Sequence, residues 1–240
     1  MLIYIKGNLL LGGSMIGIIG AMDEEISVIS SEIKNLTVYD INNMKFYKGT
    51  IYDIDIVLVK SGIGMVNAAI TTTLLFKEFG VDKILFSGVA GSLNRNINVG
   101  DIVIADSLVE YLFDATEFGY KIGTIPRMDT SVFKSDRLLN KIKNILKNDN
   151  IYYGKILSGD KFVSNLSEKE KLGVNFNALA VDMESASVAH CAHVLGIEFA
   201  VIRSISDSLN SSSVMEYTEF VNLAANNSKD VILKILKGGI

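Results

Sequence analysis

The amino-acid sequence predicts an α/β fold: a single domain with a central β-sheet and helices on both of its faces. Three observations support this prediction. Strand-like apolar runs alternate with stretches of helical periodicity from residue 15 to the C-terminus. Several of these runs end in glycine-rich turns, which allow the backbone to reverse direction sharply. No linker, internal repeat or low-complexity tract interrupts the 240 residues, so we expect one domain.

The N-terminal half supplies the first four expected strands and two helices. Residues 16–22 are an apolar run of the kind that forms a buried strand. The helix that follows has isoleucines at helical spacing and three acidic residues in its first turn, where the helix dipole favours negative charge. Two strand-like runs joined near Asp53 predict a hairpin. The first helix covers residues 23–33, and the hairpin strands cover residues 44–53 and 54–62. The half also contains an expected helix over residues 64–80 and a strand over residues 82–91.

The C-terminal half continues the alternation. Four apolar residues spaced to share one face predict a helix over residues 138–147. A second helix, residues 184–196, ends at Gly196, a residue type common just after a helix. The remaining elements expected here are the strands 101–111, 152–160, 178–183 and 198–207 and a final helix from about Tyr217 to Lys237.

The first fourteen residues stand apart from this pattern. They are partly apolar but lack the small-residue cleavage site of a signal peptide. Met15 opens the first regular strand. We therefore expect Met15 to be the natural start, residues 1–14 to be an N-terminal extension, and residues 15–240 to form the functional domain.

Composition limits the chemistry. The 23 Lys and Arg residues against 27 Asp and Glu give a net charge of −4 and a pI near 5.3, which argues against nucleic acid or an anionic membrane as the main partner. No apolar run reaches the ~18 residues of a membrane span, and we expect a cytoplasmic protein. The single cysteine excludes an internal disulfide and a Cys-rich zinc module. Two histidines within four residues of each other leave carboxylates as the expected proton carriers.

Acidic residues follow several of the predicted strands. In open α/β sheets, ligands bind where the strands reach their carboxyl ends. Glu25, Glu184 and Asp207 all come shortly after such ends. Taken singly, each acid is explained by helix capping or by the helix dipole. Three acids at one edge, together with glycine turns that let a ligand approach the backbone, indicate a binding or catalytic site.

Two other motifs are weaker. Residues 61–67, SGIGMVN, follow a strand and open a helix, but Asn67 replaces the third glycine of the dinucleotide fingerprint. The acid expected about 20 residues on, Asp82, begins a strand instead of ending one. His190 and His193 have no obvious third metal ligand, so we interpret them as packed or subunit-facing helix residues.

Eight blocks of the sequence together form a recognisable pattern. They are IGIIGAMDEE, VKSGIGMVNA, FSGVAGSL, VGDIVIAD, DATEFGY, SGDKFV, AVDMESASVAH and VIRSISD. In this order and spacing, the chain from Met15 onward resembles the 5′-methylthioadenosine/S-adenosylhomocysteine nucleosidases of the nucleoside phosphorylase/hydrolase superfamily. The resemblance implies a mixed sheet, a homodimer, and hydrolysis of the N-glycosidic bond of adenine thionucleosides. It implies no cofactor and no metal.

The resemblance also implies roles for individual residues. Glu25 would activate the attacking water, Asp207 would be the general acid at the purine N7, and Glu184 would hold the ribose hydroxyls. The substrate-binding positions it implies, with Phe162 stacked on adenine and Arg203 positioning the water, are Met22, Ile63, Val89, Ala90, Gly91, Phe118, Pro126, Phe162, Val163, Asp182, Met183, Arg203, Ser206 and Tyr217. Ile63, Phe118 and Pro126 fall where the family builds the pocket for the 5′-substituent, partly across the dimer interface. Val89 stands where some members have serine.

The first strand's turn favours water over phosphate as the nucleophile. Related phosphorylases hold phosphate there with glycine and arginine, whereas this chain has Met22 followed by three carboxylates, which repel a phosphate dianion. Hydrolysis needs a protonated leaving group and an oxocarbenium-like transition state stabilised by carboxylates. The alternatives are a purine nucleoside phosphorylase of the same fold, an aminofutalosine nucleosidase, whose relatives share SGVAGSL, and a non-catalytic nucleoside-binding protein.

Overall fold

A computed structural model describes residues 14–147, 149–209 and 213–240, with the backbone alone for 213–219. Its strands are β1 (Ile16–Gly20), β2 (Lys34–Ile41), β3 (Met44–Ile51), β4 (Ile54–Lys60), β5 (Lys83–Ser92), β6 (Ile102–Glu110), β7 (Ile151–Ser158), β8 (Ala178–Asp182) and β9 (Glu198–Asp207). Its helices are α1 (Asp23–Ser30), α2 (Met65–Phe79), α3 (Asp136–Ile145), α4 (Leu166–Phe176), α5 (Ser185–Leu195) and α6 (Ser213–Lys237), with a 3₁₀ turn at Thr116–Phe118.

Within the described residues, all nine strands form one mixed sheet in the order β2-β3-β4-β1-β5-β8-β7-β6-β9. β1 runs parallel to β4 and β5, whereas β2, β3 and β4 pair antiparallel. β9 pairs with β5 as well as with β6, so β5, β8, β7, β6 and β9 form a closed ring. The predicted α/β fold with a central mixed sheet is confirmed.

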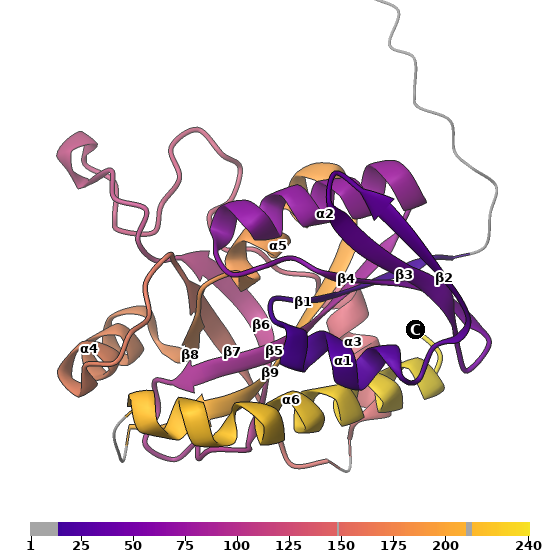
Figure 1. The fold of residues 1–240 in the computed structure, drawn as a ribbon. Helices are drawn as coiled ribbons and strands as arrows, with labels where there is room; N and C mark the ends of the chain where they lie inside the picture. The colour runs from indigo at the N-terminus through magenta and orange to yellow at the C-terminus, as the bar shows by residue number, and fades with distance from the viewer. Residues whose placement is uncertain (1–13, 148, 210–212) are drawn as a thin grey trace, which may run out of the picture.

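Helices cover both faces of the sheet (Figure 1). α2 and α5 pack against each other on one face, and Ala68, Leu75 and Val188 from these helices join its apolar core. α1, α3 and α6 cover the other face, where Ile29 and Ile142 are completely buried. Since strand β1 lies between the two layers, all five of its residues are buried. A strand covered on both faces reads as a continuous apolar run, which is why the pattern of residues 16–20 identified it.

The hairpin predicted near Asp53 is present. β3 and β4 pair antiparallel up to Ile51 and Ile54, and the two residues between them, Tyr52 and Asp53, have φ values of 50° and 60°. Positive φ at both central residues matches the right-handed twist of a two-residue hairpin. The helix expected to end at Gly196 does so, with the glycine left-handed at φ 71°.

Three features differ from the sequence-based expectation. β2 and α4 were not predicted, and β5 runs to Ser92, so the glycines expected to form a turn at the end of strand 82–91 lie within the strand. All of β2 except Ile41 is exposed, so β2 has no buried apolar face to reveal it, and among the strands that the structure describes it pairs with β3 alone. β5 continues through its glycines because β9 supplies partners there, including Arg203 opposite Gly88. None of the described helices is long and apolar enough to cross a lipid bilayer.

Candidate active site

A cavity of about 340 Å³ opens where β1, β5, β8 and β9 reach their carboxyl ends. It lies at the edge predicted from the strand order of an α/β sheet. Twelve of its fourteen lining residues are among the predicted site residues: Met22, Glu25, Ile63, Val89, Ala90, Gly91, Phe162, Asp182, Met183, Glu184, Ser206 and Asp207. A larger polar depression of about 510 Å³, beside α3 and β7, contains none of them.

Glu25 is held in the first turn of α1 by three backbone N–H groups. Its Oε2 accepts hydrogen bonds from Ala21 (2.5 Å) and Met22 (3.2 Å), and its Oε1 accepts one from Val89 (3.1 Å). Burial raises the pKa of the Glu25 carboxyl, although the positive charge of Arg203 and the three hydrogen bonds oppose this. The result is a buried carboxyl, fixed in orientation, whose pKa is shifted toward that of a general base.

Arg203 is buried beneath the cavity and does not line it. Its guanidinium lies over the Phe86 ring at 3.8 Å, and its Nε donates to Asp182 Oδ2 at 2.8 Å. Asp182 also accepts from the hydroxyls of Ser158 and Ser185, so this carboxylate is engaged by protein donors although it lines the cavity. Arg203 Nη2 is buried without a hydrogen-bond partner among the described residues. A buried donor without a protein partner is a position where a buried water can bind.

Gly88 gives Arg203 and Glu25 the space to approach each other. A Cβ atom placed at Gly88 would overlap Arg203 Nη1 and would lie only 2.6 Å from Glu25 Oε1. Overpacking of this kind in a core costs about 1–3 kcal/mol and moves the side chains involved. We expect Gly88→Ala to lower the free energy of unfolding by about this amount, measured in urea, and to reduce turnover as well. A variant with wild-type stability and turnover would contradict this reading of the close approach.

Glu184 stands just before α5, as its N-terminal flanking residue, and is almost fully buried. Its Oε1 accepts a hydrogen bond from the backbone N–H of Gly64 at 2.8 Å, in the segment that only half-matched a dinucleotide motif. Gly64 has φ 104°, a conformation that suits glycine. Burial, and then the charge of Asp182, raises the pKa of Glu184 to about 7, against the opposing charge of Arg203.

The raised pKa of Glu184 gives stability a defined pH dependence. Below its ordinary value of 4.5 this carboxyl is protonated in both states; between 4.5 and about 7 the unfolded chain releases the proton while the folded protein keeps it. The residue therefore lowers stability progressively as pH rises through that window. We expect the free energy of unfolding of Glu184→Gln, relative to that of wild type, to rise by roughly 2–3 kcal/mol between pH 5 and pH 8, measured in urea. Parallel curves for the two proteins would refute the shift.

Asp207 ends β9, and both of its oxygens have protein partners. Oδ1 accepts from the Ser206 hydroxyl at 3.0 Å, and Oδ2 pairs with the ammonium of Lys169. Lys169 comes from α4 and is completely buried. The sequence-based reasoning missed this residue because α4 itself was not predicted, and a lysine between two glutamates normally indicates a solvated surface.

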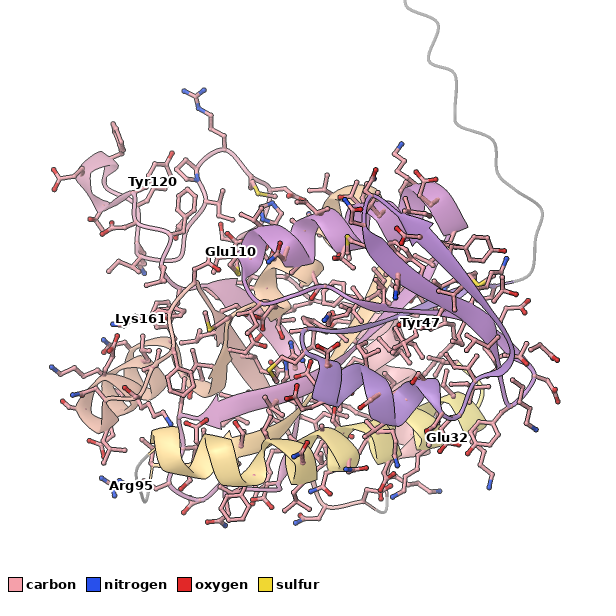
Figure 2. The ribbon with its side chains drawn as sticks, viewed as in Figure 1. Glu32, Tyr47, Arg95, Glu110, Tyr120 and Lys161 are labelled. Atoms are coloured by element: carbon pink, nitrogen blue, oxygen red, sulfur yellow. The ribbon has the colours of Figure 1, made fainter. Side chains whose placement is uncertain are left out.

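The remaining predicted residues are placed differently. Val163 lines a separate recess of about 30 Å³ beside Phe162, whereas Pro126 lies outside both spaces. Phe118 is 84% exposed, in the loop after β6 that also carries Tyr120 and projects from the body of the molecule (Figure 2). Tyr217 belongs to α6, but its side chain lies outside the described residues.

The two histidines lie on α5, away from the cavity. His190 Nδ1 is 2.8 Å from Glu110, and its ring stacks on Phe133. His193 Nε2 is 3.0 Å from Asp129. In the segments that the structure describes, no three His, Cys, Asp or Glu side chains are grouped so as to hold a metal ion.

Comparisons with known proteins agree with this architecture. The model of the phosphorylase superfamily matches residues 15–237. The 5′-methylthioadenosine/S-adenosylhomocysteine nucleosidase of Staphylococcus carnosus is 40% identical over 226 residues, covering 93% of this chain and 99% of that protein. The nucleosidase of the same name from Helicobacter pylori, solved in complex with a substituted pyrrolidin-3-ol, superimposes with a TM-score of 0.89 at 35% identity, covering 94% and 99% of the two chains.

A second similar structure carries a different name. Futalosine hydrolase of Helicobacter pylori superimposes with a TM-score of 0.88 at 34% identity, covering 93% of this chain and 97% of that one. Both relatives from this bacterium therefore share the fold over nearly their whole length. With the superfamily match and the Staphylococcus relative, these similarities establish that the chain belongs to the phosphorylase superfamily, among its 5′-methylthioadenosine/S-adenosylhomocysteine nucleosidases, which are N-glycosidic hydrolases.

Proposed function

We propose that this protein hydrolyses the N-glycosidic bond of 5′-methylthioadenosine and S-adenosylhomocysteine, releasing adenine. The observation that carries the proposal is the meeting of three buried carboxyls, Glu25, Glu184 and Asp207, in one cavity. Two carboxyls are the minimum for hydrolysing a glycosidic bond with one acid and one base. A third suits the ribose, whose hydroxyls need acceptors and whose ring becomes positively charged in the transition state.

Glu25 is the residue we assign to water activation. Its raised pKa favours acceptance of a proton from water, and its hydrogen bonds to three backbone N–H groups fix its direction. The unpaired Nη2 of Arg203, whose guanidinium charge acts on Glu25, is a donor available to hold that water. Asp207, on the separate strand β9, is then the acid for the purine N7.

Apolar side chains complete the nucleoside site. Phe162 lines the cavity and is 43% exposed there, and we assign its ring to stacking on adenine. Met22 and Met183 lie in the same lining and suit the sugar and the thioether, since the methionine side chain adapts to irregular apolar surfaces. One oxygen of Glu184 accepts a hydrogen bond from the backbone N–H of Gly64, and we assign its other oxygen to the ribose hydroxyls.

The identity of the nucleophile provides the first test. In the turn after β1, Asp23 and Glu24 are exposed beside the buried Glu25, and a phosphate dianion would be repelled there. We expect adenine release from 5′-methylthioadenosine at the same rate with and without added phosphate, with thioribose as the second product. The measurement is ultraviolet detection of adenine together with mass analysis of the sugar. Strict dependence on phosphate, with a sugar phosphate as product, would indicate a phosphorylase instead.

Aminofutalosine is the second candidate substrate. The observation that favours it is the similarity to futalosine hydrolase, which is as close as that to the Helicobacter nucleosidase. The reaction type is the same, because both substrates carry an N-glycosidic bond to a purine-derived base. Kinetic comparison of 5′-methylthioadenosine, S-adenosylhomocysteine, 5′-deoxyadenosine and aminofutalosine ranks the candidates. A kcat/KM highest for aminofutalosine would reassign the physiological substrate.

A homodimer in the cytoplasm is part of the same proposal. Exposed apolar side chains lie on the packed pair α2 and α5 and on the projecting loop, among them Val66 and Val194 on the two helices and Phe118 on the loop. A second copy seated on this surface would cover them and bring Phe118 and Pro126 toward a partner's 5′-pocket. Analytical ultracentrifugation tests the assembly. A monomer at micromolar concentration would remove both residues from the proposed pocket.

A further inference from the structure

Lys169 is the single buried residue of helix α4, and its side chain is completely inaccessible. Lysine is almost never fully buried unless it is paired. The charged residues on either side behave differently: Glu168 pairs at the surface with Lys161, and Glu170 pairs with Arg95. α4 therefore directs one cation inward, onto Asp207, while its neighbours keep solvent-exposed partners.

Stability alone does not explain this pair. Removing two charges from water costs about as much as their attraction returns, so a buried ion pair is weak evidence for a stabilising role. The pair also falls on Asp207, the residue assigned to the leaving group, and both Asp207 and Gly91 line the cavity. A Cβ atom at Gly91 would lie 3.0 Å from Asp207 Oδ2 and 3.4 Å from Lys169 Nζ. The absence of a side chain at Gly91 thus leaves room for the pair beside the cavity, where Asp207 alone of the two lines it.

We infer that Lys169 is a positioning residue for the leaving-group step, which holds Asp207 and restores the proton that Asp207 delivers to the purine N7. The inference rests on the proposed nucleosidase function. An ammonium beside a carboxylate and a neutral amine beside a carboxylic acid differ by the position of one proton and have the same net charge. Inside a protein, where isolated charges are costly, a paired group can hold that proton without creating a new net charge.

The proton balance of the step is complete. Before the step, Lys169 is an ammonium beside the Asp207 carboxylate. The C1′–N9 bond breaks, and its electron pair goes to the purine while N7 takes a proton from Asp207, which takes one from Lys169 Nζ in the same transfer. Asp207 is then a carboxylate again and Lys169 is a neutral amine. The water oxygen bonds to C1′ and its proton passes to Glu25. After adenine and the thioribose leave, Glu25 releases a proton to solvent and Lys169 takes one up. The overall reaction is therefore nucleoside plus water giving adenine plus the thioribose.

The test separates leaving-group assistance from general damage by using two substrates. We expect Lys169→Met to lower kcat for 5′-methylthioadenosine by ~10²-fold with KM changed less than threefold, since one positioned acid contributes about that much. We expect little change with p-nitrophenyl 5-methylthioriboside, because p-nitrophenolate departs without protonation. The matched control is Lys171→Met, which removes an exposed lysine from the same helix and should leave both rates unchanged.

The outcomes are distinct. Wild-type kcat for 5′-methylthioadenosine in folded Lys169→Met, or equal loss on both substrates, would overturn the inference, because the residue would then be dispensable or merely structural. If Lys169→Met does not fold, the comparison is Asp207→Asn with and without Lys169→Met, which removes both charges together. We expect no additional loss from the second change, and a further tenfold loss would overturn the inference. Absence of adenine release by the wild-type protein would instead reject the proposed function.

Discussion

Asp207→Asn is expected to lower kcat for 5′-methylthioadenosine by about 10³-fold, within the 10²–10⁴-fold range of one positioned acid. An amide has no proton to give to N7, so the adenine would have to leave as an anion. The Kd for the nucleoside should change much less, because asparagine has nearly the same shape and can still hydrogen-bond the purine. Single-turnover rates measure the first quantity, and equilibrium binding at 4 °C measures the second.

The same substitution removes the charge that pairs with Lys169. Breaking a buried ion pair by neutralising one partner costs about 3–5 kcal/mol, so the thermal unfolding of Asp207→Asn must be recorded beside its kinetics. Asp230→Asn is the matched control, because Asp230 is exposed on α6 and pairs only with its neighbour Lys229. Turnover by Asp207→Asn within tenfold of wild type would remove Asp207 from the role of acid.

Glu25→Gln is expected to cause the second large loss, also ~10²–10⁴-fold in kcat. Glutamine cannot accept the proton of the attacking water. Both oxygens of Glu25 accept hydrogen bonds from backbone N–H groups. The amide nitrogen of glutamine would replace one of these oxygens, so it would face either the N–H groups of Ala21 and Met22 or the N–H of Val89. Opposed donors in a buried position cost about 1–3 kcal/mol, which urea unfolding measures.

The neighbouring Glu24→Gln is the control for this variant. Glu24 lies in the same helical turn but is exposed to solvent, so its amide should leave turnover and stability unchanged. Equal effects at both positions would show that the turn as a whole matters, and would remove Glu25 from the role of base.

Local patterns predicted the parts of the fold that have local causes. The apolar run at residues 16–22 revealed β1, which is buried throughout and ends at Gly20, and the spacing of Leu138 and Ile142 revealed α3. β2 and α4 have no such signal, because one is exposed along almost its whole length and the other buries a single lysine. The ring of five strands depends on β9 pairing with both β5 and β6, and no short-range pattern encodes partners so distant in sequence.

The site was predictable to a similar extent. Glu25, Glu184 and Asp207 come at or shortly after strand ends, where α/β sheets place ligands, so the strand pattern and the family blocks made them candidates, and the structure places all three in one cavity. The groups that hold these carboxyls in place could not be predicted. The N–H of Val89 that donates to Glu25 and the ammonium of Lys169 that pairs with Asp207 come from elements far away in the chain. Such contacts depend on the assembled tertiary structure, and a linear sequence read alone does not contain them.

The closed ring of strands has a consequence for synthesis on the ribosome. β9 lies between β5 and β6 and carries Arg203 and Asp207, yet it is the last strand to be made. Until β9 emerges, β5 and β6 expose unpaired edges and the candidate site lacks both Asp207 and Arg203. Folding that waits for long-range pairing is slow and exposes such edges to aggregation. We therefore expect a shortened chain that ends before β9 to be captured by chaperones or degraded, and to have no activity.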